Sequence, residues 1–224
     1  MVLRDFNESN IIFVHVPKTG GGTIECIILE DYFKYSKDID LKEERKKIFS
    51  LNKQWTQHHS ITETISERRI YDPENYFKFA FVRNPWDRIV SEYLYMKNNA
   101  GCACRGNIRK IPKSFEEYIV GNFKCSWRNH VAEQYKFIYN SREELMVDFL
   151  GRFENFEEDL NKLLKKLGIQ NRKNIPYVNQ TRTPKQRIIK PYWMYYNKET
   201  KKIIEQKFEK DIKLFGYTFD EPEF

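Results

Sequence analysis

An apolar run that ends in a glycine-rich turn most constrains the fold of this chain. Residues 10–16 read N-I-I-F-V-H-V, and residues 17–22 read P-K-T-G-G-G directly after them. A short run of β-branched residues with a turn signal behind it predicts a buried strand. The apolar spacing over residues 23–33 then predicts a helix. A strand, a tight loop and a helix in this order indicate the start of an α/β fold.

A second unit of the same kind follows. Residues 76–82, Y-F-K-F-A-F-V, predict another buried strand, and residues 84–97 predict a helix with Asn84 as its N-cap and Pro85 as its first residue. We expect one domain over residues 1–224, with a P-loop-like α/β fold and a mostly parallel sheet flanked by helices. Further helices are expected over 114–123, 155–168 and 198–216, a surface loop or helix over 35–47, and a loop over 98–113.

The last of these helices has a clear apolar stripe. Ile204, Phe208, Ile212 and Phe215 recur at helical spacing, and Gly216 follows them as a natural stop. We expect this stripe to pack in the core and to bind no ligand.

Composition limits the class of protein. Charged residues make up 32% and aromatic residues 16% of the chain, which is typical of a folded, soluble protein. The net charge of +7 favours an anionic ligand, although a solvated lysine-rich surface explains it equally well. No stretch approaches the about 20 apolar residues of a membrane span, and the first residues lack a secretory core. A cytoplasmic protein is therefore expected, but a longer protein trimmed of an anchor would look the same.

The four cysteines do not predict a metal site. They are Cys26, Cys102, Cys104 and Cys125. A structural zinc ion needs four ligands in tighter pairs than this spacing offers. We expect reduced thiols, with a disulfide in the loop left open.

The first loop has the composition of an anion site. Its three glycines let backbone N–H groups converge, the following helix adds its positive end, and one lysine and two threonines add a charge and hydroxyls. In the nucleoside-triphosphate loop the lysine follows the glycines, whereas this one precedes them. A plain turn with a solvated lysine is the alternative. The candidate binding loop comprises Pro17, Lys18, Thr19, Gly20, Gly21, Gly22 and Thr23.

The second loop, over residues 81–91, also offers an anion ligand. Arg83 ends the second strand, and a guanidinium can hold a phosphate through two parallel hydrogen bonds. Ser91 lies eight residues further on, and local physics alone does not select it.

Taken together, the two loops resemble the cofactor signatures of sulfotransferases that use 3′-phosphoadenosine 5′-phosphosulfate (PAPS). H-V-P-K-T-G-G-G-T resembles the 5′-phosphosulfate loop, and F-V-R-N-P-W-D-R-I-V-S-E-Y resembles the 3′-phosphate motif. Residues 151–160 and 208–219 are similar to late segments of the Golgi-type carbohydrate sulfotransferases and their soluble bacterial relatives. One departure is small: the usual loop reads P-K-T-G-G-T-S, whereas Gly22 and Thr23 fill its last two places.

The resemblance implies a function. PAPS would donate a sulfuryl group, adenosine 3′,5′-bisphosphate would be the product, and no metal would be required. Lys18 would stabilise charge on the oxygen that bridges phosphorus and sulfur, while Arg83 and Ser91 would hold the 3′-phosphate. The acceptor would be a hydroxyl group, expected on a glycan, with a peptide tyrosine, a lipid or a small alcohol left open. We expect no nucleic-acid partner, and the oligomeric state stays open.

The resemblance also implies a histidine base between the two loops. The family pattern reads H-x-[ST]-x-x-E, and His58, Ser60 and Glu63 fit it. An imidazole suits proton abstraction near neutral pH. We favour His58 over His59 and take Glu63 as the next candidate, with a pair of surface histidines as the alternative.

Two other histidines receive lesser roles. His15 lies in the expected first strand and is expected to be structural. His130 and Gln134 match an H-x-x-x-Q segment of relatives, which implies that they line the acceptor cleft.

Two other functions compete with this interpretation. A nucleotide kinase or NTPase would show a lysine after the glycines and a strand-end aspartate for Mg²⁺. A non-catalytic module that binds anionic polysaccharide or nucleic acid would fit the charge and the aromatics, but not two phosphate loops.

Overall fold

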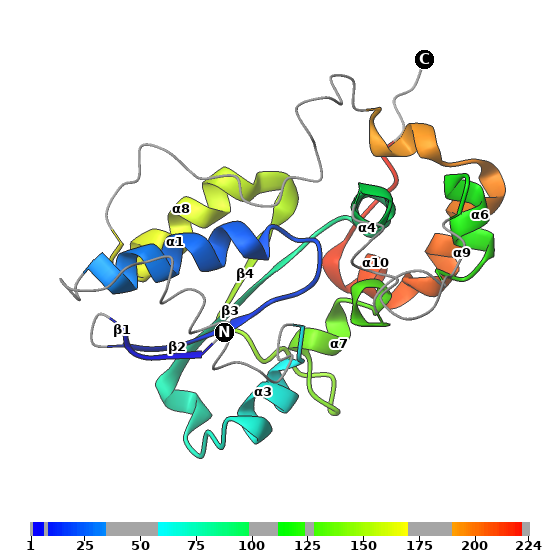
Figure 1. Ribbon diagram of the computed structural model, residues 1–224. Coiled ribbons are helices and arrows are strands. Elements are labelled where there is room, and N and C mark those ends of the chain that lie inside the picture. Colours follow the sequence, from blue (N-terminus) through cyan, green and yellow to red (C-terminus); the bar gives the residue numbers. More distant parts are fainter. Residues whose placement is uncertain are drawn as a thin grey trace, which may run out of the picture. The chain divides into compact units, whose positions relative to one another are not determined.

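A four-stranded sheet forms the centre of the first part of the fold. Figure 1 shows the computed structural model, which describes residues 2–6, 9–34, 58–98, 112–123, 128–169 and 190–220. The sheet order is β1-β2-β3-β4, in which β2, β3 and β4 are parallel and β1 pairs with β2 antiparallel. The mostly parallel α/β sheet is therefore confirmed. The strands are β1 (Val2–Phe6), β2 (Ser9–Val14), β3 (Tyr76–Val82) and β4 (Phe149–Arg152).

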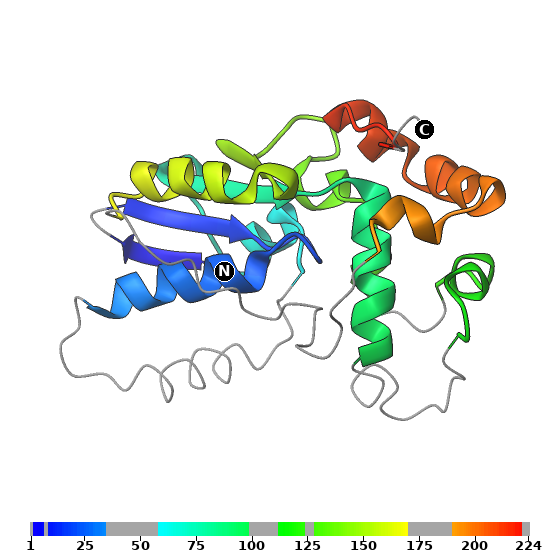
Figure 2. The same ribbon diagram turned by 90° about the horizontal axis from the view of Figure 1, so that it is seen from above.

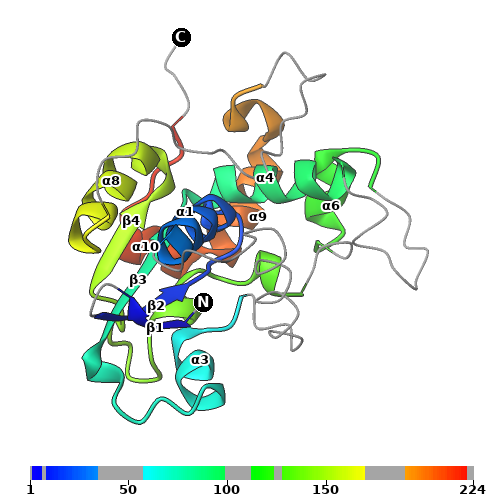
Figure 3. The same ribbon diagram turned by 60° about the vertical axis from the view of Figure 1, so that its left-hand side comes forward.

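Two helices pack against one face of this sheet. Helices α1 (Gly21–Lys34) and α8 (Phe156–Lys166) lie along the strands on the same face, as Figures 1 and 2 show, and the short α3 (Ile61–Glu67) lies on the opposite side. Figure 3 shows the same arrangement from the side. The buried core between sheet and helices is apolar and includes Ile11, Phe13, Ile24, Ile27, Ile28, Phe79, Phe81, Leu160, Leu163 and Leu164.

The chain divides into two compact units. The first comprises Met1–Val82 and Lys136–Asn179, and the second comprises Arg83–Tyr135 and Gln180–Phe224. The expected single domain over residues 1–224 stays a prediction. Several expected features lie outside the described residues: the stretch 35–47, most of the loop 98–113, and Cys102, Cys104 and Cys125.

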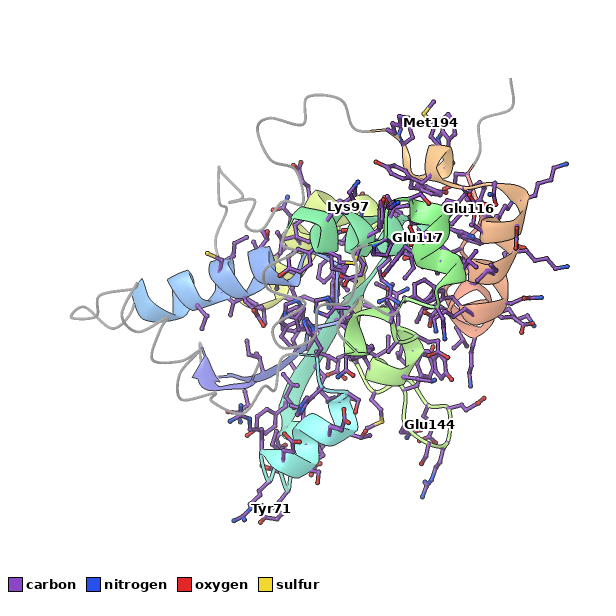
Figure 4. All side chains as sticks on the ribbon, turned by 45° about the vertical axis from the view of Figure 1, so that its right-hand side comes forward. Tyr71, Lys97, Glu116, Glu117, Glu144 and Met194 are labelled. Carbon is purple, nitrogen blue, oxygen red and sulfur yellow. The ribbon has the colours of Figure 1, made fainter. Side chains whose placement is uncertain are left out.

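The second unit is built from helices. They are α4 (Pro85–Asn98), α6 (Phe115–Val120), α9 (Lys198–Lys207) and α10 (Glu209–Phe215). Asn84 caps α4 as expected, because its Oδ1 accepts from the Trp86 N–H at 3.1 Å and its carbonyl accepts from the Arg88 N–H at 2.8 Å. On α6, Glu116 and Glu117, which are labelled in Figure 4, are exposed, whereas Phe115 is buried.

The expected single helix over 198–216 is wrong in one respect. The chain departs from helical geometry at Phe208, with φ −112° and ψ 24°, so that α9 and α10 are separate helices. Phe208 is fully buried and its ring lies under the Arg88 guanidinium, 5.3 Å from ring centroid to Cζ. Of the other residues in the expected stripe, Ile204 and Phe215 are buried and Ile212 is half-buried. Gly216 ends α10 in the left-handed conformation, as expected.

Short helical segments complete the described chain. Within the described ranges, no helix is both long enough and apolar enough to cross a membrane. The short segments are η1 (Pro73–Asn75), η2 (Arg128–Val131), α7 (Tyr135–Ile138), η3 (Phe153–Asn155) and η4 (Tyr192–Tyr195).

Candidate functional site

The glycine-rich loop connects β2 directly to α1. Lys18 and Gly20 both have left-handed backbone conformations, with φ 67° and 84°. The buried Thr19 donates its hydroxyl proton to the Val16 carbonyl oxygen over 2.9 Å, which braces the turn. Helix α1 begins at Gly21, two residues earlier than expected. The first N–H groups of a helix have no acceptor inside it, so this loop combines a half-buried lysine with a helix N-terminus.

Close aromatic neighbours require glycine at two positions of this loop. A Cβ atom on Gly21 would lie 2.2 Å from both Cδ2 and Nε2 of the His15 ring. A Cβ atom on Gly20 would lie 2.5 Å from Cε2 of Phe156, and its φ is unfavourable for other residues. The glycines therefore admit two rings to the loop as well as allowing the turn.

His15 lies just beyond the end of β2, and not within the strand as expected. Its Nδ1 is 3.1 Å from Oε1 of the buried Glu25 on α1. Its ring stacks on Phe13 at 5.5 Å and meets the His58 ring edge-on at 4.7 Å, both measured between centroids. His15 therefore connects the glycine-rich loop to the segment that carries the candidate base.

The His58 ring is held by a contact with the backbone of His15. Its Nδ1 lies 3.0 Å from the backbone oxygen of His15, and its backbone has φ 71°. A carbonyl oxygen only accepts, so Nδ1 carries the proton and Nε2 carries the lone pair of the neutral ring. The strained backbone of a non-glycine residue is a feature that functional sites often show. His58 thus has the tautomer of a general base.

The two remaining residues of the family pattern have a structural role. Ser60 and Glu63 form a capping box on α3: the Glu63 N–H donates to Ser60 Oγ at 3.2 Å, and the Ser60 N–H donates to Glu63 Oε2 at 2.7 Å. The Ser60 backbone hydrogen bond lowers the pKa of Glu63, which makes this carboxylate a poorer base. The S-x-x-E spacing is also that of a capping box, and it fixes where α3 begins after His58.

His59 lies beside a different group. Its Nδ1 is 3.0 Å from Oε2 of Glu67, a half-exposed side chain on α3. The structure therefore brings His58, and not His59, into contact with His15 and the strand end.

Arg83 follows β3 and belongs to the second unit. Its Nε and Nη2 each lie 2.7 Å from Asp87 Oδ2, one helical turn along the chain. Its backbone N–H and carbonyl group are both bonded to the Gln134 side chain, at 2.9 and 2.8 Å. Ser91 lies on α4 and is buried.

The expected acceptor-cleft role of Gln134 is wrong. Gln134 is fully buried, and the oxygen and nitrogen of its amide both bond to the backbone of Arg83. His130 lies beside the buried Glu92, with 2.9 Å between Nδ1 and Oε2. Sequence reasoning also missed the fully buried Arg88 and Asp211, because a single charged residue on an amphipathic helix gives no sign of burial.

Metal ligands do not gather in the described part of the chain. Among those residues, no group of three or more histidine, cysteine, aspartate and glutamate side chains is placed to hold a metal ion. Cys26 lies buried in α1.

Most of this chain matches a known protein family. The sequence profile of the sulfotransferase family matches residues 3–218. An uncharacterized protein of Archaeoglobus fulgidus is 33% identical over 102 residues, which cover 46% of this chain and 74% of that protein. No solved structure matches the chain.

Two matching relatives have names that describe a function. Carbohydrate sulfotransferase 11 of Danio rerio is 23% identical over 240 residues, covering 94% of this chain and 65% of the relative. Carbohydrate sulfotransferase 10 of Homo sapiens is 25% identical over 176 residues, covering 67% of this chain and 49% of the relative. The chain therefore spans less than two thirds of the length of either relative.

Proposed function

This chain belongs to the sulfotransferase family, and we propose that it transfers a sulfuryl group from PAPS to a hydroxyl group of a carbohydrate. One observation carries the proposal: His58 is bonded to the backbone of His15, and the His15 ring lies against Gly21 of the lysine-bearing loop. The candidate base and the candidate anion loop thus both belong to the first compact unit, which supports the proposal.

The loop has the parts needed for the 5′ end of the donor. Lys18 supplies a compact positive charge, and the start of α1 supplies N–H groups and the positive end of the helix dipole. The donor supplies an activated sulfuryl group. Lys18 would act where negative charge develops on the leaving oxygen, which is the place where a preorganised charge lowers a barrier most.

His58 would remove the proton of the acceptor. Nδ1 is already committed to the His15 carbonyl oxygen, so the acceptor hydroxyl proton would go to Nε2. The products are then a sulfate ester, adenosine 3′,5′-bisphosphate and a protonated imidazole. The capping box of α3 supports this role because it fixes the chain two residues after His58.

Arg83 and Ser91 would recognise the 3′-phosphate that distinguishes this donor from ATP. The assignment rests on the R-N-P-x-D-x-x-x-S motif, and the ion pair between Arg83 and Asp87 supports it by fixing one edge of the guanidinium.

The carbohydrate acceptor is supported by the relatives. Two of them are carbohydrate sulfotransferases, and the net charge of +7 suits an acidic glycan.

Calorimetry and a transfer assay test the proposal. Titration with adenosine 3′,5′-bisphosphate should give tight binding, while AMP and ATP should bind far more weakly. Incubation with labelled PAPS should then transfer label to a polysaccharide and not to a tyrosine peptide or a simple alcohol. Preference for ATP would refute the donor assignment, and label on the peptide or alcohol alone would refute the acceptor class.

A further inference from the structure

A single glutamine side chain holds the backbone on both sides of Arg83. The Arg83 N–H donates to Gln134 Oε1 over 2.9 Å, and Gln134 Nε2 donates to the Arg83 carbonyl oxygen over 2.8 Å. These two bonds join residues that are 51 positions apart in sequence. Because they hold the peptide groups before and after one Cα atom, they fix the direction in which the Arg83 side chain leaves the backbone.

Gln134 is itself held from α10. The carboxylate of Asp211 accepts the Gln134 N–H at 2.7 Å through one oxygen and the Tyr135 N–H at 2.9 Å through the other. Asp211 and Gln134 are both fully buried. Water therefore cannot replace these two bonds without opening the unit, so the backbone at Gln134 is held rigidly.

A buried arginine holds the segment just before Gln134. Arg88 on α4 donates to the carbonyl oxygens of His130, at 3.1 Å, and Ala132, at 2.6 Å. Burial lowers the pKa of Arg88, and the charge of Asp211 opposes this effect. Burial likewise raises the pKa of Asp211, and Arg88 opposes that effect. Removing either group would leave the other as a buried charge without its counter-charge, which is strongly destabilising.

The side chain of Arg83 has a constraint of its own. Asp87 lies 2.7 Å from both Nε and Nη2, which sets the orientation of the guanidinium plane. Its backbone is fixed by Gln134 and its planar end by Asp87. A side chain that is held at its backbone and at its guanidinium loses little rotamer entropy when it binds an anion.

We propose that Gln134 is a positioning residue for Arg83 and that this contact sets the preference for a 3′-phosphorylated nucleotide. The inference rests on the proposed function, in which Arg83 binds the 3′-phosphate. Gln134 itself touches no ligand, because its amide is buried and bonded to the backbone. Asp211 and Arg88 act one step further back, by holding the segment that carries Gln134.

Two substitutions test this role. Gln134→Met keeps the length of the side chain and removes both hydrogen bonds to Arg83. Gln134→Asn keeps an amide but is one methylene too short to reach both groups, and it serves where the first variant does not fold. Thr200→Ala is the matched control. Thr200 is a buried capping residue of α9 in the same unit, and its hydrogen bonds join it to Asn197 and not to Arg83 or Gln134.

The readout is a ratio of two dissociation constants. Calorimetry measures binding of adenosine 3′,5′-bisphosphate and of AMP to each purified variant, after circular dichroism has shown that it is folded. The preference for the bisphosphate should fall by about tenfold or more in both Gln134 variants, while the affinity for AMP changes little. Thr200→Ala should lower the melting temperature and keep the preference of the wild type.

The outcomes separate the inference from the proposed function. A folded Gln134 variant with the preference of the wild type would overturn the positioning role, and so would an equal loss of preference in Thr200→Ala. Equal binding of both nucleotides by the wild type would instead overturn the proposed donor, and with it the inference.

Discussion

His58 donates a hydrogen bond from Nδ1 to the backbone carbonyl oxygen of His15 over 3.0 Å. Because a carbonyl group cannot donate, this contact assigns the proton to Nδ1 and the lone pair to Nε2. The His15 ring, in turn, lies where a side chain on Gly21 would be, and its Nδ1 is 3.1 Å from Glu25. The tautomer of the candidate base is therefore set by the strand end from which the candidate anion loop starts.

The first prediction concerns this base. His58→Ala should lower kcat by about 10²-fold or more, because no group then accepts the proton of the acceptor. Affinity for adenosine 3′,5′-bisphosphate should stay near that of the wild type. His59→Ala is the control, since His59 lies beside Glu67 on α3 and should leave kcat nearly unchanged. A large loss of kcat in the control alone would move the base by one position.

The second prediction concerns Lys18. Its proposed effect is greatest where charge develops in the transition state, so Lys18→Ala should lower kcat by about 10²–10³-fold. Binding of the product nucleotide should suffer much less, because the loop N–H groups remain. Lys18→Arg should restore little activity, since the planar fork cannot place a compact charge at the same point. Saturation kinetics decide the matter: a raised KM with an unchanged kcat would make Lys18 a binding residue only.

The third prediction concerns recognition of the 3′-phosphate. Arg83→Ala should weaken binding of adenosine 3′,5′-bisphosphate by about 2–5 kcal/mol, the usual loss when one partner of a desolvated charge pair is removed. Binding of AMP should hardly change. Calorimetry with both nucleotides measures the difference. If both lose the same affinity, Arg83 does not read the 3′-phosphate.

The fourth prediction concerns Gly21. Gly21→Ala should destabilise the protein by about 1–3 kcal/mol, because its Cβ would lie 2.2 Å from two atoms of the His15 ring. The displaced ring would also disturb the backbone contact to His58, so kcat should fall as well. Thermal unfolding and kinetics together measure the two effects.

A second glycine provides the control for that experiment. Gly216 has φ 64°, and a Cβ atom there would meet no atom within 4 Å. Gly216→Ala should therefore cost about 1 kcal/mol through backbone strain alone and leave kcat unchanged. A loss of activity equal to that of Gly21→Ala would show that general destabilisation, and not the His15 contact, explains both variants.

Local signals in the sequence determined most of the secondary structure. The run 76–82 became β3 with the expected bounds, and Asn84 caps α4 as its position predicts. Gly216 ends α10 in the left-handed conformation, as a glycine after an apolar stripe indicates. These features depend on residues within one or two turns of one another, so a pattern in the chain is enough to predict them.

Short or bent elements were not predictable in the same way. β1 and β4 have five and four residues, too few to show a period, and both are stabilised by pairing with a neighbouring strand. The break between α9 and α10 falls at the buried Phe208, inside an apolar stripe of helical spacing, so no local pattern marks it.

The candidate site shows the same division. The sequence by itself determined which residues are candidates: the glycine-rich loop, His58 or His59, Arg83 and Ser91. The family pattern already favoured His58 over His59, but only the tertiary structure bonded the His58 ring to the strand end and connected Gln134 to Arg83. These bonds join residues 43 and 51 positions apart. No local pattern contains such a pair, because the contact exists only once the chain has folded.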